Sequence, residues 1–330
     1  MGWAALLTDV LTSKTPRPVR LQRGAHAIAD AFLEGRIPQF EADQADLWVN
    51  AADWLVESGE LAAAREALQA LKQAQPGLEW AANLCDLVER APPPEPGMPD
   101  FHDDLLKDVQ VMPRAGSETA LLLFCGARHR VGMHLPLIHR WLARLGASLI
   151  YLRDFHGLCY LKGVASLGDD LQSTIAALRR TLDGLGARQV IGFGCSGGGY
   201  GAMRYALELG GDVVSMGSPA NMEPDFNQHM NHGAYAKMLK AAFPDQDLDM
   251  RRRIEAAARP ARTLIVYGDR NWNERIHAEH MAGLQGATLY PVTRYQGHAT
   301  AAELVRRGAF ESLLKDFRDG RPIAAAETAR

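Results

Sequence analysis

The fold is decided by the stretch Gly192-Phe193-Gly194-Cys195-Ser196-Gly197-Gly198, which begins within the end of an apolar run, Gln189–Phe193, and precedes a helical pattern, Gly199–Leu209. Five of these residues, 194–198, have the form Gly-x-Ser-x-Gly, in which a serine lies on a sharp turn between a strand and a helix. Glycines beside such a serine let neighbouring backbone approach closely, because they carry no Cβ. The stretch therefore predicts an exposed, nucleophilic Ser196 at the end of a buried strand.

Two other interpretations of this stretch stay open. Gly192, Gly194 and Gly197 also fit the dinucleotide pattern Gly-x-Gly-x-x-Gly, which opens a strand–helix–strand unit and is followed by an acidic residue about 20 residues later. Here at least two predicted strands come first, and the acidic candidate, Asp212, precedes the next strand instead of following it. The stretch could also be a glycine-rich packing turn.

Outward from this turn, short apolar runs alternate with helical patterns. Continuous runs flanked by helices are typical of a mostly parallel sheet covered by helices on both faces. Ligands of such sheets bind at the carboxyl ends of the strands. The predicted strands are Ala120–Cys125, Ser148–Leu152, Gln189–Phe193, Val213–Met216, Thr263–Tyr267 and Thr288–Val292, and the predicted helices include His139–Leu145, Leu171–Leu185, Gly199–Leu209, His277–Leu284 and Ala301–Phe317.

Candidate partners of the serine follow it in the chain. Asp269 comes just after the strand Thr263–Tyr267, and His298 lies in the loop after the last predicted strand. In this arrangement the order serine, acid, histidine is the expected one. We predict that His298 is the general base and that Asp269 orients its imidazole. Glu274 lies in the same loop as Asp269 and is the alternative acid.

Backbone amides at the same edge are predicted to hold a developing oxyanion. One is the amide of Gly197, and the other comes from Gly126 or Ala127 in the loop after the strand Ala120–Cys125. In that loop Arg128 and Arg130 are candidate substrate contacts, although they could equally be solvated. Asp154, after the next strand, could contact substrate or brace its own loop.

A metal site is not predicted. His229 and His232 are three residues apart with Asp225 nearby, but there is no His-Glu-x-x-His motif and no cysteine cluster. We expect the stretch Asn221–His232 to form a lid or a loop over the pocket instead.

The first 95 residues differ in pattern from the rest. A proline-rich segment, residues 91–97, separates a helical region (1–95) from the sheet-forming domain (96–330). Leu47, Ala51, Trp54 and Leu55 recur at helical spacing, and a second apolar stripe follows over residues 61–71. This helix-turn-helix pattern resembles a tetratricopeptide repeat, which implies either a packed helical cap or a surface for a protein partner.

Composition excludes several classes of function. The chain has 330 residues, 47% of them hydrophobic, and a net charge of −3, which is unlike a nucleic-acid binder. No apolar run approaches the roughly 18 residues that a membrane span needs, so no membrane partner is expected. The N-terminal stretch, residues 1–18, lacks a basic segment before its short apolar run and is a poor secretory signal. Four cysteines without a paired motif fit a reduced compartment, which predicts a cytoplasmic protein.

The serine turn, the order Ser196, Asp269, His298 and the alternating strands resemble the α/β-hydrolase superfamily over roughly residues 100–320. The resemblance implies a Ser-His-Asp/Glu triad, a two-amide oxyanion hole, an acyl-enzyme intermediate and no cofactor. This sequence lacks the His-Gly-Gly-Gly motif of typical lipases and carboxylesterases. Its general layout is also similar to hydrolase-like O-acetyltransferases of accessory protein secretion.

Three hypotheses about function follow. The first is a serine hydrolase that acts on an ester, thioester or amide of a small-molecule or acylated substrate. The second is an O-acyltransferase with the same triad, in which a hydroxyl group replaces water. The third is a non-catalytic binding module that keeps the fold without the reaction.

Overall fold

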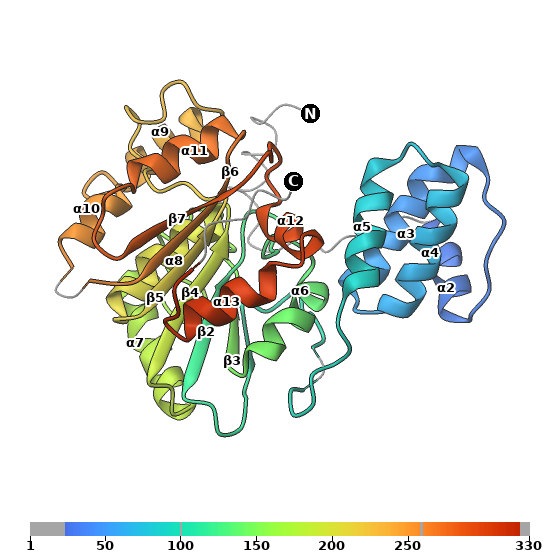
Figure 1. The fold of residues 1–330 in the computed structure, drawn as a ribbon, viewed down its shortest axis with the longest axis horizontal. Coiled ribbons are helices and arrows are strands. Elements are labelled where there is room, and N and C mark those ends of the chain that lie inside the picture. Colours follow the sequence, from blue (N-terminus) through green and yellow to red (C-terminus); the bar gives the residue numbers. More distant parts are fainter. Residues whose placement is uncertain (1–23, 100, 258–259, 324–330) are drawn as a thin grey trace.

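The computed structural model describes residues 24–99, 101–257 and 260–323. Over these residues the chain forms a helical region beside a sheet with helices on both of its faces (Figure 1). The fold class predicted from the sequence is therefore confirmed. The N-terminal stretch that we considered as a signal lies outside the described residues, and no helix within them is long and apolar enough to cross a membrane.

The helical region consists of short helices whose apolar sides face one another. Trp48, Leu55 and Leu68 are fully or almost fully buried between them. Gly59, with a φ of +86°, makes the turn that separates the two predicted stripes. The predicted helices are confirmed, whereas the likeness to tetratricopeptide repeats stays a prediction. The helices are α2 (Ala25–Leu33), a 3₁₀ turn (Ala42–Gln44), α3 (Ala45–Glu57), α4 (Leu61–Ala74) and α5 (Glu79–Arg90).

The sheet has the strand order β1-β3-β2-β4-β5-β6-β7 within the described residues. Neighbouring strands are parallel except β1, which pairs with β3 in the antiparallel direction. The sequence did not predict β1, whose residues alternate instead of forming an apolar run. The strands are β1 (Val109–Met112), β2 (Thr119–Phe124), β3 (Ser148–Leu152), β4 (Gln189–Cys195), β5 (Asp212–Met216), β6 (Thr263–Gly268) and β7 (Ala287–Val292).

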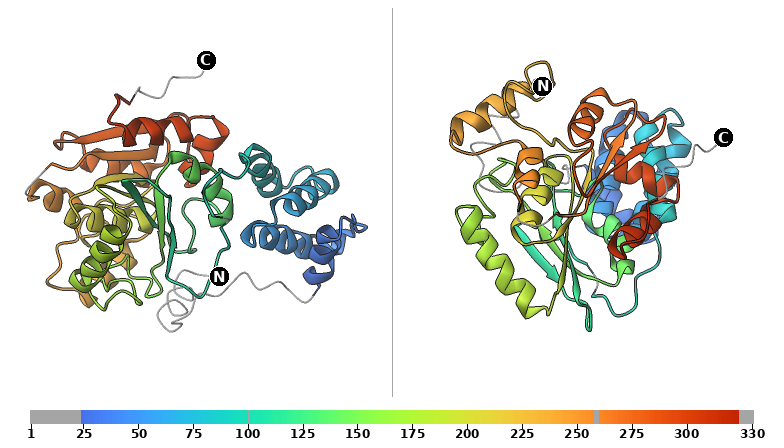
Figure 2. Two further views of the ribbon diagram at one scale, coloured as in Figure 1. Left: turned by 90° about the horizontal axis from the view of Figure 1, so that it is seen from below. Right: turned by 60° about the vertical axis from the view of Figure 1, so that its left-hand side comes forward.

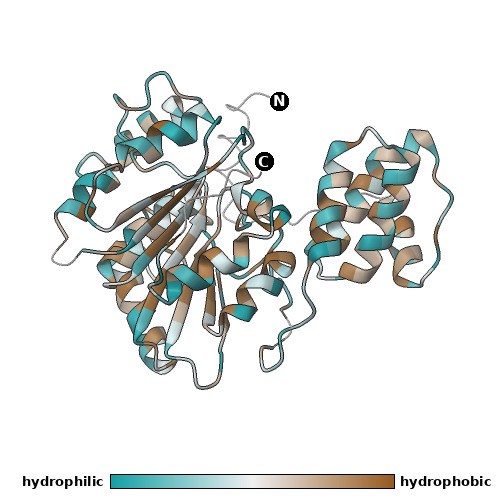
Figure 3. Cartoon of the chain, in the orientation of Figure 1, coloured by the Kyte–Doolittle hydropathy of each residue, from teal (hydrophilic) through white to brown (hydrophobic). Residues whose placement is uncertain are grey.

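The strands of the sheet are mostly hydrophobic (Figure 3), and their buried residues pack on both faces. Leu121 and Leu123 of β2 pack in the cluster that contains α6 (Leu135–Leu142), α12 (Thr300–Arg306) and α13 (Phe310–Arg318). Leu122 and Phe124 point to the other face, toward α7 (Leu171–Gly184) and α8 (Gly197–Glu208). Successive strand residues alternate between faces, which explains why continuous apolar runs predict a doubly covered sheet.

Some helix boundaries differ from those predicted. The pattern Ala301–Phe317 forms two helices, because Gly308 adopts a φ of +70° that a continuing helix cannot contain. The helix predicted at His277 begins earlier, as α11 (Trp272–His280), since the Asn271 side chain caps it. The helix predicted over His139–Leu145 is formed by α6 and a 3₁₀ turn, Ala143–Leu145, that follows it. Two short helices of the sheet-forming domain were not predicted: α9 (Gly233–Ala242) and α10 (Met250–Glu255).

Within the described residues, two helix pairs make the main contacts between the helical region and the sheet-forming domain. Helix α3 packs against α6, which follows the loop after β2, and α5 packs against α12, which follows His298. Figure 2 shows the helical region beside the sheet-forming domain from two further directions. Both contacts therefore involve helices that begin at the edge where the sequence places the site.

Candidate functional site

Ser196 lies on a strained turn between β4 and α8. Its φ of 55° and ψ of −133° are rare for a residue with a side chain, and such strain clusters at functional sites. The turn needs glycine on both sides: a Cβ on Gly194 would lie 2.3 Å from the carbonyl oxygen of Gly198, and one on Gly198 would lie 2.1 Å from that of Phe124. The backbone amide of Ser196 donates to Met216 on the next strand. The backbone therefore has the sharp strand-to-helix turn that the Gly-x-Ser-x-Gly pattern predicts.

His298 pairs with a buried carboxylate at the same edge of the sheet. Its Nδ1 lies 2.8 Å from Oε1 of Glu274. The glutamate side chain is 4% exposed, whereas that of His298 is 61% exposed. A buried carboxylate on Nδ1 fixes the ring orientation and leaves Nε2 free on the exposed side.

Two residues, Gly268 and Asn271, hold Glu274 in place in the first turn of α11. The amide of Gly268 donates to its Oε2 at 2.8 Å, and Nδ2 of Asn271 donates to its Oε1 at 3.1 Å. Asn271 also accepts from the amide of Glu274, so cap and glutamate bind each other. Gly217 leaves the room for the carboxylate, because a Cβ there would lie 2.9 Å from Oε1.

The structure differs from the sequence prediction at Asp269. Its Oδ1 accepts a hydrogen bond from the backbone amide of Tyr295 at 3.1 Å, so Asp269 braces the loop before the histidine. The carboxylate that contacts His298 is Glu274, the alternative acid. The pattern Asn271-x-x-Glu274 is a capping signal that can be recognised in the sequence. The burial of the Glu274 side chain cannot be recognised there.

Contacts of the surrounding loops bring the serine turn and the histidine segment together. Gly132, in the loop after β2, packs between them: a Cβ on it would lie 2.8 Å from Ala301 Cβ and 3.0 Å from Cys195 Sγ. Ala301 follows His298 by three residues, and Cys195 precedes Ser196. The predicted serine and base therefore lie at one end of the sheet.

Of the predicted oxyanion donors, two keep a free amide. The amide of Gly126 donates to the carbonyl of Arg130 at 2.9 Å, so it is not available, contrary to the prediction for that residue. Gly197 is the first residue of α8 and has no partner inside the helix. Among the described residues, neither Gly197 nor Ala127 donates a backbone hydrogen bond.

Of the three candidate substrate contacts, only Arg128 has a side chain that does not bind another described residue, whereas Arg130 and Asp154 bind other parts of the chain. Arg128 is exposed and makes no ion pair or hydrogen bond with the described part of the chain. Arg130 instead pairs with Asp53 and Glu57 of α3. Asp154 accepts the amides of His156, Leu158 and Tyr160, which makes it a loop-bracing carboxylate. Because all three hydrogen bonds lie within one loop, the Asp154 carboxylate stabilises that loop instead of facing a substrate.

A pair of histidines beside this edge was not predicted. His232 Nε2 lies 3.1 Å from Nε2 of His277 on α11, and Nδ1 of His277 accepts from the amide of Ala220 at 3.3 Å. Burial, with the nearby His232 and His280, lowers the pKa of His277 to about 3. Burial likewise lowers the pKa of His232, with a contribution from His298. Both rings are therefore neutral at physiological pH.

The predicted lid segment is braced internally by Asn227 and contacts α11 through His232. Asn227 is buried and donates to the carbonyls of Asn221 and Glu223. His232, at its end, faces His277, whereas His229 is exposed. In residues 24–99, 101–257 and 260–323, no group of three metal-binding side chains lies together.

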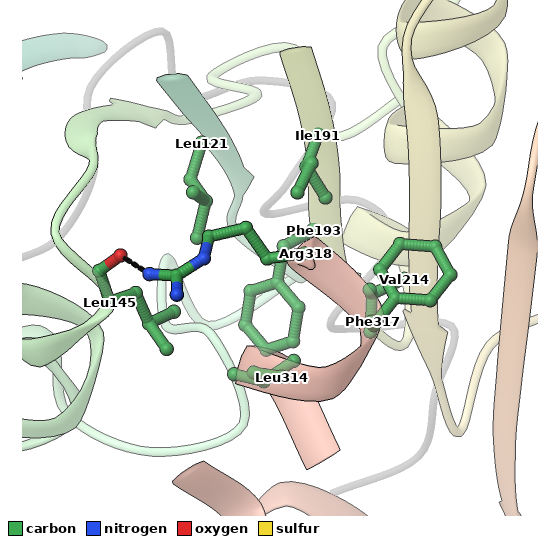
Figure 4. Close-up of a pocket in the computed structure, with 8 residues that line it drawn as sticks. All are labelled: Leu121, Leu145, Ile191, Phe193, Val214, Leu314, Phe317 and Arg318. Carbon is green, nitrogen blue, oxygen red and sulfur yellow. Dashed lines mark hydrogen bonds between the residues drawn. The ribbon is translucent and has the colours of Figure 1, made fainter. Parts of the chain in front are cut away.

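Two cavities lie away from the serine. Figure 4 shows one under α13, lined by Phe193, Val214 and Leu314 among others, with a volume of about 10 Å³. That volume holds at most one water molecule, so it cannot accept a substrate. The second, of about 280 Å³, lies between the α3–α4 turn at Gly59 and Pro136 of α6, and no predicted site residue lines it.

No family model and no curated protein matches this sequence. Among solved structures, the chain is similar to a puromycin-hydrolyzing peptidase of Mycobacterium tuberculosis, with 13% identity and a TM-score of 0.47. The match covers 71% of this chain and 41% of that one, so this chain spans less than half of the peptidase.

Two further solved structures are similar over more of their own length. One is esterase B from Lactobacillus rhamnosis inhibited by a tributyrin phosphonate (14% identity, 77% of this chain, 95% of that chain, TM-score 0.47). The other is AbyA5 (17% identity, 96% of this chain, 97% of that chain, TM-score 0.46). These likenesses are distant, and the fold described above rests on the strand order and the turn at Ser196.

Proposed function

We propose that this protein is a serine hydrolase that cleaves an ester, thioester or amide through an acyl-enzyme intermediate. The observation that supports it most is the pairing of two features at one end of the sheet. Ser196 lies on a turn with a φ of 55°, and His298 is held through Nδ1 by the buried Glu274. The acid in this proposal is Glu274, with Asp269 as a bracing residue.

The first half of the reaction forms the acyl-enzyme. Ser196 Oγ attacks the carbonyl carbon while its proton moves to Nε2 of His298. Glu274 stays ionised and stabilises the imidazolium through Nδ1. The carbonyl oxygen becomes an oxyanion facing the free amides of Gly197 and Ala127. When the tetrahedral intermediate collapses, the bond to the leaving group breaks and that group takes the proton from His298.

The second half returns the enzyme to its starting state. Water, or the hydroxyl of an acceptor, gives a proton to His298 and attacks the acyl carbon. Collapse then breaks the bond to Ser196 Oγ, which regains its proton from the imidazolium. The acceptor alone distinguishes a hydrolase from an O-acyltransferase, because the protein groups have the same tasks in both.

The loop after β2 supports a polar or anionic part of the substrate. Arg128 is exposed beside the candidate oxyanion donor Ala127. With its guanidinium unpaired in the described part of the chain, it is the substrate contact that we retain from the sequence prediction. A protein partner for the helical region and a cytoplasmic location stay predictions.

Labelling with a fluorophosphonate probe tests the proposal directly. Wild-type protein should be labelled, while Ser196→Ala and His298→Ala should lose labelling and ester hydrolysis. Loss of such residues typically costs on the order of 10⁴- to 10⁶-fold in rate. Mass spectrometry should place the adduct on Ser196.

Two controls separate this result from its alternatives. Ser218→Ala changes a serine whose hydroxyl donates to Met216 O at the end of the neighbouring strand, and it should keep the label. Folded wild-type protein that resists the probe and a panel of activated esters would favour the non-catalytic binding module. Products formed with added alcohols instead of water would identify a transferase.

A further inference from the structure

Building on the proposed function, we propose that helix α3 of the helical region positions the oxyanion loop of the site. The loop consists of residues 126–134, between β2 and α6, and it carries the free amide of Ala127. In this proposal Asp53 and Glu57 are positioning residues that act through Arg130 and His134. The helical region is then part of the catalytic unit as well as a separate helical layer.

The oxyanion loop is a closed turn that Arg130 completes. The amide of Gly126 donates to Arg130 O, and the amide of His129 donates to Gly126 O, each at 2.9 Å. His129 adopts a φ of 56°, a strained value for a residue with a side chain. Because Ala127 lies inside this turn, the direction of its amide depends on where Arg130 is held.

Arg130 is held by two carboxylates from α3. Its Nη2 lies 2.5 Å from Oε2 of Glu57 and 3.1 Å from Oδ2 of Asp53. The two carboxylates are four residues apart, so they share one face of the helix. Glu57 is 7% exposed and Arg130 is 18% exposed, which reduces the screening of the pair by solvent.

His134, at the end of the same loop, joins these carboxylates. Its Nε2 lies 2.7 Å from Oδ1 of Asp53 and 3.5 Å from Oε2 of Glu57. Burial opposes the charged form of Asp53, but the hydrogen bonds and charges of His134 and Arg130 outweigh it and lower its pKa to about 2. The carboxylates therefore contact both the fifth and the ninth residue of the loop.

The other contact of the helical region does not touch this loop. Oδ1 of Asn83, on α5, accepts from Arg306 of α12 at 2.5 Å. If the helical region only packed against the domain, loosening either contact would have the same consequence. If α3 positions the loop, only the contact through Arg130 changes the chemistry.

The test compares Glu57→Gln, Arg130→Met and their double variant in the full-length protein, with Asn83→Ala as the matched control. The substrate is a p-nitrophenyl ester, and fluorophosphonate titration gives the fraction of active sites. A trifluoromethyl ketone, which forms a tetrahedral adduct with the serine, reports on the oxyanion hole. Asp53→Asn, whose side chain is less buried, serves if Glu57→Gln does not fold.

We expect kcat per active site to fall about 10- to 100-fold in Glu57→Gln, with KM changed less than about threefold. Affinity for the trifluoromethyl ketone should fall in parallel with kcat/KM. The two losses should not add in the double variant, because both single changes remove the Glu57–Arg130 pair. Asn83→Ala should match wild type.

Two results would overturn the inference in different ways. Glu57→Gln and Asp53→Asn with normal kcat per active site, and only a lower melting temperature, would show that α3 merely packs against the domain. A folded wild type that fails to react with fluorophosphonate would remove the proposed function itself, and the positioning role with it.

Discussion

The two sides of the candidate site are supported in different ways. On the acid–base side, the groups that hold Glu274 and His298 are Gly268 and Asn271, which lie within 30 residues of the histidine. On the oxyanion side, Arg130 and His134 are held by Asp53 and Glu57, which precede them by more than 70 residues and belong to the helical region.

The difference shows that the sheet-forming domain alone holds the acid–base side of the site, whereas the oxyanion side also depends on the helical region. Strand ends, a capped helix and a tight turn place the proposed acid and base from local sequence. The oxyanion loop has strained backbone at His129, and its Arg130 pairs with Glu57 of the helical region, outside the sheet-forming domain. Changes on the two sides should therefore have different consequences, and three experiments can sharpen this comparison.

The largest effect should come from the acid–base side. Glu274→Ala removes the carboxylate on His298 Nδ1 and should lower kcat on an activated ester on the order of 10³- to 10⁴-fold. Asp269→Ala, which loses a loop contact with the Tyr295 amide, should lower kcat less than about tenfold. Steady-state kinetics with active-site titration measures both.

Equal losses in Glu274→Ala and Asp269→Ala would contradict this assignment of the acid. Glu303→Ala is a matched control, since this glutamate of α12 pairs with Arg306 and with Arg307, just after the helix, instead of the histidine. Its kcat should stay at the wild-type value.

An effect of intermediate size, on stability, should come from Asp154, which braces a loop next to the oxyanion loop. Asp154 binds the amides of His156, Leu158 and Tyr160, and the Tyr160 hydroxyl lies 2.8 Å from the carbonyl of Cys125, just before the oxyanion loop. Asp154→Ala leaves these amides without their acceptor and should lower the free energy of unfolding by about 2–3 kcal/mol. Urea denaturation measures it.

Asp169→Ala is the control for this prediction, because Asp169 is exposed in a nearby loop. It should change the free energy of unfolding by less than about 0.5 kcal/mol. Similar values for the two alanine variants would mean that the bracing contacts of Asp154 add nothing to stability.

The smallest effect should appear in the pH dependence of stability. His277 has a folded-state pKa of about 3, below the ordinary value of 6.5. Between these values the unfolded chain binds more protons, so stability falls as the pH drops from 6.5 toward 3. His277→Gln, which cannot be protonated, should reduce this slope by at most about 1.4 kcal/mol per pH unit.

Unfolding curves between pH 7 and 5 measure this slope. His26→Gln changes an exposed histidine of α2 and should leave the slope as in wild type. If His277→Gln shows the full wild-type slope, then the ring is charged in the folded protein and the neutral pairing with His232 is wrong.

Much of the fold could be predicted because its signals are local. Apolar runs such as Ser148–Leu152 identify buried strands, and Gly-x-Ser-x-Gly after a strand identifies the turn at Ser196. The edge strand β1 was missed, since its alternating residues carry no such run. The order of residues in the chain also placed His298 at the same end of the sheet as Ser196, as the structure has it.

The sequence by itself determined the alternating architecture, the serine turn and the loops that carry the proposed base and acid, because periodicity and glycine spacing act over a few residues. Only the tertiary structure decided that Glu274 meets His298 while Asp269 braces Tyr295. It also decided that Arg130 turns toward α3 and leaves Arg128 free. These choices depend on distances between segments far apart in the chain, and side chains of the same charge have no local signal that separates them.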